Sequence, residues 1–167
     1  NILSKVYSKK DEYRKTVNQK DNSNSINTPN NDLNIIKIDS LKKLIAKIQA
    51  DTSKIILYEN LGQTYRNKKK IDSSILSYKQ ALEINEKANY SLQKQCADIA
   101  AIDYLLFTTG NYIESLNYAT RQLALSEVLK DTFQMGFSYA TFGHNYKALG
   151  EYRLSLNNYF KARKIFN

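Results

Sequence analysis

Three stretches of the sequence repeat one order of residue types at a spacing of about 40 residues. Each begins with a helical segment, at 61–65, 102–106 and 142–146. A turn follows, which Gly110 and Gly150 mark in the second and third copies, and a second helical segment then opens with a small residue: Ser74, Ser115 or Ser155. This period is typical of stacked helical hairpins. The sequence therefore predicts an all-α protein, built as an α-solenoid.

The pattern also predicts where the helices begin and end. Leu41, Leu44, Ile45 and Ile48 share one face behind a start signal at Asp39, so we expect a leading helix at 39–50. The array then spans 53–167, with repeats at about 55–88, 96–129 and 136–167. We expect three pairs of helices in this array: 53–67 with 71–87, 89–109 with 111–129, and 132–149 with 151–166.

Residues 1–38 form a separate N-terminal segment. Between 21 and 34 this segment is rich in asparagine and contains Pro29, the single proline of the chain. Polar residues of this kind bury too little apolar surface to offset the entropy that is lost on ordering. We therefore expect 21–34 to be a flexible linker ahead of the array.

Small residues recur where the two helices of one hairpin are expected to approach each other closely. Gly62 and Gly143 hold this position in the first and third copies, where a larger side chain would push the helices apart. The second copy instead carries Asp103 there, and it has Gln122 at a later position where the other copies have alanine. We therefore expect the helix packing to shift locally around the second repeat.

The combined pattern resembles the tetratricopeptide repeat family. The third copy is close to that family's motif, with Tyr139, Phe142, Gly143, Tyr146, Gly150, Tyr152, Ser155, Tyr159 and Ala162. The first copy departs from the motif at its turn, where Lys69 replaces glycine. The resemblance covers residues 53–167 and implies a right-handed superhelix of about three helical hairpins plus the leading helix. It also implies a module that binds proteins or peptides and is not an enzyme.

In that family the first helix of each hairpin lines a concave groove. Carried over by position, the resemblance implies a ligand groove lined by Asn60, Gln63, Arg66, Asn67, Tyr104, Phe107, Thr108, Phe137, Thr141, His144 and Lys147. Tyr104, Phe107 and Phe137 are the candidate anchors, since aromatic side chains often dominate binding energy. The alternative is that both phenylalanines are buried between neighbouring hairpins. For His144, the alternative to a ligand contact is a histidine that is hydrogen-bonded to a neighbouring residue.

A second, shorter resemblance concerns the segments 38–41 (IDSL) and 51–54 (DTSK). They look like the tetratricopeptide sensor region of bacterial two-component kinases and helix-turn-helix regulators. This implies the sensor or scaffold region of a larger bacterial signalling protein, which would be periplasmic; otherwise we expect a cytoplasmic location. The other hypotheses are a structural assembly adaptor without a diffusible ligand and, third, a nucleic-acid-binding array.

The amino-acid composition limits the classes of function that we expect. The net charge of +9 comes from scattered basic residues, which are more typical of solvated faces than of a phosphate-binding track. Cys96 and His144 are the single cysteine and histidine, and no catalytic or phosphate-binding motif is present, so we expect no enzyme, no cofactor and no metal. No apolar run is long enough to cross a bilayer, so we expect no membrane contact by these residues. The last helix ends the array with apolar residues such as Tyr159 and Phe166, so we expect either that further hairpins follow or that the chain self-associates through residues 151–166.

Overall fold

The computed structural model describes residues 38–49 and 51–167 of the chain. This part forms seven helices and no strand, which confirms the predicted all-α class. They are α2 (Ile38–Lys47), α3 (Asp51–Asn67), α4 (Ile71–Ala88), α5 (Leu92–Thr108), α6 (Tyr112–Val128), α7 (Thr132–Ala148) and α8 (Tyr152–Phe166). The leading helix α2 ends at Lys47, three residues before the predicted end. Nearly all of the predicted N-terminal segment, and its linker at 21–34, lie outside the described residues.

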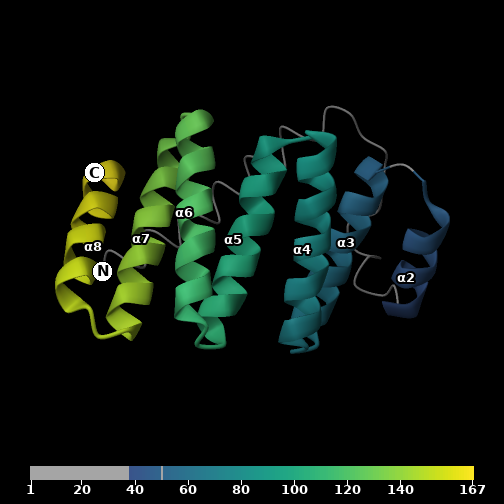
Figure 1. Cartoon of the computed structure of the whole chain (residues 1–167), viewed down its shortest axis with the longest axis horizontal. Coiled ribbons are helices and arrows are strands. Elements are labelled where there is room, and N and C mark those ends of the chain that lie inside the picture. Colours follow the sequence, from purple (N-terminus) through teal and green to yellow (C-terminus); the bar gives the residue numbers. More distant parts are fainter. Residues whose placement is uncertain (1–37, 50) are drawn as a thin grey trace.

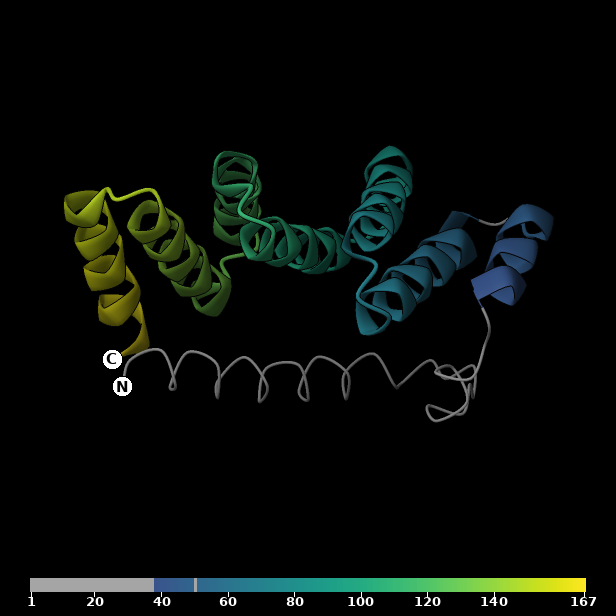
Figure 2. The same ribbon diagram turned by 90° about the horizontal axis from the view of Figure 1, so that it is seen from below.

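The helices stack in chain order into an elongated solenoid of hairpins, α3 with α4, α5 with α6 and α7 with α8 (Figure 1). Figure 2 shows α3, α5 and α7 along one side of the stack and α4 and α6 along the other. Each hairpin also packs against the next, α4 on α5 and α6 on α7. Each hairpin contacts mainly its neighbours. The array therefore has two long surfaces, one formed by the first helices of the hairpins and the other by the second helices.

The three hairpin turns share one backbone geometry although their residues differ. Lys69, Gly110 and Gly150 have φ angles of 58°, 80° and 81°, in the left-handed region. In the first turn the Lys70 amide donates to the Tyr65 carbonyl at 2.9 Å, which satisfies a carbonyl at the helix end. Glycine adopts this conformation freely, whereas lysine does so at a cost in free energy. The first turn therefore keeps the shape that the other two obtain from glycine.

A core cluster joins the first two hairpins. It comprises buried side chains of α4 and α5: Tyr78, Leu82, Ile99, Ile102, Leu105 and Leu106. Ile71 and Ile75 of α4 are partly buried against it. Burial of one aliphatic side chain of this kind contributes about 1.5–3 kcal/mol, so this apolar contact between hairpins is a main source of stability.

Gly62 and Gly143 lie at close approaches between helices, and a tyrosine ring from the partner helix occupies the space beside each of them. A methyl group added at Gly62 would lie 2.9 Å from the Tyr78 ring, and one added at Gly143 would lie 2.6 Å from the Tyr159 ring. The two glycine carbonyls also accept hydrogen bonds across their hairpins, at 2.7 and 2.8 Å, from Ser74 Oγ and Ser155 Oγ. Glycine is thus required by the large ring opposite it.

The second copy exchanges the large and the small side chain. Asp103 stands in place of glycine, and Ala119, which is fully buried, stands in place of tyrosine. The small residue on α6 leaves room for the Asp103 carboxylate, which accepts a hydrogen bond from Ser115 Oγ. Asn145 of α7 donates through Nδ2 to the same Oγ at 2.8 Å. The exchange therefore comes with a buried polar network that extends into the third hairpin.

Candidate functional site

The predicted groove residues lie on α3, α5 and α7, which form one side of the stack (Figure 2). Four of them are exposed: Asn67, Tyr104, Thr108 and Lys147. Six are half-buried: Asn60, Gln63, Arg66, Phe107, Phe137 and His144. Thr141 is buried, with 8% of its surface accessible, and offers little surface to a ligand. Tyr104 is the most accessible aromatic residue of the set, at 44%.

Phe107 belongs to a row of aromatic rings that joins the second and third hairpins. Its ring centroid lies 5.6 Å from that of Tyr112 and 5.9 Å from that of His144. His144 in turn meets Tyr159 edge to face, at 5.5 Å. Such tilted and edge-to-face contacts are favourable by about 0.5–1.5 kcal/mol each. Phe107 therefore packs between hairpins while part of its ring remains accessible.

Phe137 has a more structural environment than Phe107. It packs against a small cluster formed by the buried residues Ala140 and Ala162, which join α7 to α8. Of the three predicted aromatic anchors, Tyr104 is thus exposed, Phe107 is shared between packing and surface, and Phe137 contributes to the core of the third hairpin.

His144 has an electrostatic environment that disfavours its charged form. Burial, and to a smaller extent the nearby charge of Lys147, lower the pKa of His144 below its ordinary value of 6.5. The ring is therefore neutral at pH 7, and a neutral imidazole has one hydrogen-bond donor and one acceptor. Acidification would place a positive charge between the Phe107 and Tyr159 rings.

The first-repeat end of this face is polar. The Gln63 side chain donates through Nε2 to Asn67 Oδ1 at 2.9 Å, one helical turn away. Its carbonyl oxygen accepts a longer bond from the Tyr78 hydroxyl at 3.4 Å. The two amide side chains therefore hold each other in place, while Asn67 remains exposed to solvent. This end offers amide donors and acceptors, whereas the middle of the face offers aromatic surface.

Between α3 and α5 lies a charged group that the site prediction did not contain. Lys94 Nζ is 3.0 Å from Glu59 Oε2, and Asp98 lies one turn after Lys94 with 2% of its surface accessible. Within the described residues, Asp98 Oδ2 has no hydrogen-bond partner. Burial, followed by the negative charge of Glu59, raises the pKa of Asp98 to about 8, while Lys94 acts in the opposite direction. At pH 7 Asp98 is therefore largely a neutral acid beside an ion pair.

Sequence reasoning missed this group because its members are brought together by the stacking of two hairpins. Glu59 and Lys94 are 35 residues apart. The spacing of four residues between Lys94 and Asp98 is the single local signal, and it is ordinary on helix surfaces.

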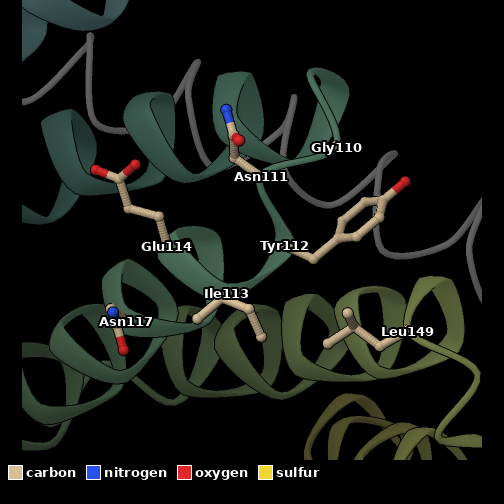
Figure 3. A pocket seen from close by; sticks show the side chains of 7 residues that line it. All are labelled: Gly110, Asn111, Tyr112, Ile113, Glu114, Asn117 and Leu149. Atoms are coloured by element: carbon tan, nitrogen blue, oxygen red, sulfur yellow. The ribbon is translucent and has the colours of Figure 1, made fainter.

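A hollow of about 410 Å³ lies outside the predicted groove, between the turn from α5 to α6 and the end of α7 (Figure 3). It is lined by Gly110, Asn111, Tyr112, Ile113, Glu114, Asn117 and Leu149. Ile113 and Leu149 are accessible at 64% and 39%. None of the predicted groove residues lines this hollow.

No group of three or more His, Cys, Asp or Glu side chains within residues 38–49 and 51–167 is arranged to hold a metal ion. Burial raises the pKa of the Cys96 thiol to about 11, so the thiol stays protonated and weakly nucleophilic at neutral pH. The helices of this part are too short or too polar to cross a bilayer.

Comparison with known proteins gives the family of the repeat. Residues 56–87, which comprise most of α3 and α4, match the model of the tetratricopeptide repeat. The crystal structure of the tetratricopeptide domain of Arabidopsis FLU superposes with a TM-score of 0.63 at 17% identity, over 69% of this chain and 96% of that domain. The chain has the tetratricopeptide-repeat fold. The predicted resemblance to this family is thereby confirmed.

A second solved structure extends the likeness of the tetratricopeptide array. Rap protein, crystallised in complex with competence and sporulation factor, has a TM-score of 0.62 and 20% identity. The match covers 77% of this chain but 37% of the Rap chain. No curated protein matches the sequence significantly. These similarities establish the fold of the array. Which ligand the array binds depends on the side chains of this chain.

Proposed function

We propose that this tetratricopeptide array is a non-enzymatic module that binds a protein or peptide segment along the face formed by α3, α5 and α7. The observation that carries the proposal is the exposed Tyr104 ring, one turn before Phe107 on the middle helix of this face. An exposed aromatic residue on a rigid helix is well suited to anchor a partner, because its large surface is ordered at little entropic cost.

The chemistry of the face predicts the kind of segment that it binds. Tyr104 and Phe107 favour an aromatic or aliphatic side chain, since they offer apolar surface and ring edges. The Gln63 and Asn67 amides favour a polar neighbour or the backbone of an extended peptide, because they present both donors and acceptors. We therefore expect a segment with one apolar anchor flanked by uncharged polar residues.

The finer proposal is that the array is the sensor or scaffold region of a bacterial signalling protein. It rests on the similarity of residues 38–41 and 51–54 to such regions. The alternative is an assembly adaptor that joins subunits. Gene sequence beyond residue 167 separates them: a membrane helix with a kinase or DNA-binding segment supports the sensor, and further repeats support the adaptor. A nucleic-acid-binding role would instead show binding that weakens steeply with added salt.

A selection followed by two tyrosine variants tests the binding proposal. Peptides of random sequence displayed on phage are selected on the immobilised chain, and the enriched peptides are then measured by fluorescence anisotropy. Tyr104→Ala is expected to weaken their binding by about thirtyfold, the size of a typical hot-spot loss. The control is Tyr90→Ala, because Tyr90 is equally accessible, at 46%, but lies in the connection between α4 and α5. Equal effects of the two variants, or no enriched peptide, would refute the proposal.

A further inference from the structure

On α4 and α6, one face of the second helix packs against the hairpin that follows it. On α4, Ile71, Ile75 and Leu82 pack into the core cluster that contains Ile99 and Ile102 of α5. Helix α5 returns antiparallel to α4 after a short connection, so Leu82 lies toward the beginning of α5 and Ile71 toward its end. The three residues thus form a face that receives one antiparallel helix.

The same three positions recur in the later copies. On α6 they hold Tyr112, Leu116 and Leu123, which are all half-buried, and α6 packs against α7. On α8 they hold Tyr152, Leu156 and Arg163, and all three are exposed. Tyr152 is accessible at 70% and Leu156 at 55%. Phe160, at 55%, extends the apolar stripe by one turn.

Among the described residues nothing covers this surface of α8, which we call the α8 face and define by Tyr152, Leu156, Phe160 and Arg163. It lies at the end of the solenoid, where Figure 1 shows α8 with one helical neighbour, α7. The α8 face keeps the apolar residues with which earlier copies receive a helix. It differs from them by one change of chemistry, an arginine where α4 and α6 have leucine.

The charged residues of α8 determine which kind of helix can pack on the α8 face. Arg153, Arg163 and Lys164 are exposed on α8, whereas Glu151 lies at its start. A second copy of α8 packed on this face would add its own Arg153, Arg163 and Lys164 but a single carboxylate, Glu151, so cations would outnumber carboxylates in a partly desolvated contact, which is unfavourable. A helix with carboxylates would instead pair with Arg163, whose planar guanidinium binds carboxylate in a bidentate geometry.

We propose that the α8 face binds an acidic amphipathic helix of a partner protein, oriented antiparallel to α8. By correspondence with α5 on α4, the C-terminal half of that helix contacts Tyr152 and Leu156 through apolar residues. Its N-terminal half presents carboxylates to Arg163. This is an interaction surface separate from the one that contains Tyr104.

Two synthetic helices of about 18 residues test this proposal, since shorter peptides are poorly helical in water. Both are hydrocarbon-stapled and share one leucine stripe; the first has glutamates in its N-terminal half and the second has lysines at the same positions. Binding to the full chain is measured by fluorescence anisotropy. We expect the glutamate peptide to bind and the lysine peptide to bind at least about tenfold more weakly.

Variants locate the site and separate it from other outcomes. Leu156→Ser should weaken the binding of the glutamate peptide about tenfold. Arg163→Glu should reverse the preference, so that the lysine peptide binds more tightly than the glutamate peptide. Leu76→Ser is the matched control, because Leu76 of α4 is accessible at 61% and lies outside the α8 face. Tyr104→Ala should leave the affinity unchanged. The proposal is overturned by equal binding of both peptides or by an equal effect of Leu76→Ser. It is also overturned by dimerisation, seen in sedimentation equilibrium, that Leu156→Ser abolishes.

Discussion

The buried Asp98 predicts an unusual dependence of stability on pH. Its pKa is raised from an ordinary value of 3.8 to about 8, so the folded chain holds a proton that the unfolded chain releases. Between these two values the unfolded state binds fewer protons, and stability therefore falls as the pH rises. The loss begins near pH 4 and levels off above about pH 8.

The size of this loss follows from the pKa difference. Each pKa unit corresponds to about 1.4 kcal/mol, so the ceiling is about 6 kcal/mol. Movement of Lys94 toward the carboxylate and entry of water would stabilise the ionised form of Asp98. We therefore expect a loss of stability smaller than this ceiling, about 2–3 kcal/mol. Asp98→Asn removes the titrating group and keeps the side-chain shape. The stability advantage of the variant should be small at pH 5, where part of the loss has already occurred, and should reach this amount at pH 9.

Urea unfolding followed by circular dichroism at pH 5, 7 and 9 measures the difference between the two proteins. His144 also affects stability, because its lowered pKa makes the folded state less favourable as the pH falls below 6.5. That effect is common to both proteins and cancels in the difference. Asp72→Asn, at an exposed position of α4, is the control and should not reproduce the difference. A wild-type minus variant difference that is the same at pH 5 and pH 9 would refute the reasoning.

Two further predictions concern the turns and the close contacts of the array. Lys69→Gly should stabilise the chain by about 0.5–1 kcal/mol, because glycine adopts φ near 58° without strain, and a lower urea midpoint would contradict this. Asp103→Gly should cost about 2 kcal/mol, since it removes a buried hydrogen-bond acceptor and leaves a cavity. Adding Ala119→Tyr to that variant restores the glycine–tyrosine pair of the other copies and should recover about half of the loss. Strictly additive losses in this double-mutant cycle, measured by urea unfolding, would count against the exchange of volumes.

The helices were predictable because their signals are local. Apolar residues at helical spacing and turn residues lie within a few residues of the structure that they determine, and the observed bounds of α3 to α8 lie within three residues of the expected ones. Leu105 and Tyr146, for example, belong to segments that occupy corresponding positions in the second and third copies. The turn at Lys69 forms without glycine, because the flanking helices impose the left-handed conformation on a residue that does not prefer it.

The candidate site was less predictable, because exposure depends on contacts between copies. The predicted positions are on the expected helices, yet Thr141 is buried and Phe137 packs in a small core. Of the three predicted aromatic anchors, Tyr104 is the one whose side chain is exposed. The repeat pattern contains no information that separates these three side chains, since all occupy first helices of their hairpins.

The sequence by itself determined the fold class, the approximate ends of the helices and the need for glycine at two close helix contacts. These features depend on backbone propensity and on side-chain volume within one hairpin. The tertiary structure alone decided that Asp98 is buried beside the Glu59–Lys94 ion pair and that the α8 face keeps its apolar residues exposed. Both results depend on how one hairpin covers the next. That stacking determines which side chains lose their contact with water, because it brings together residues that lie about one repeat apart in the sequence.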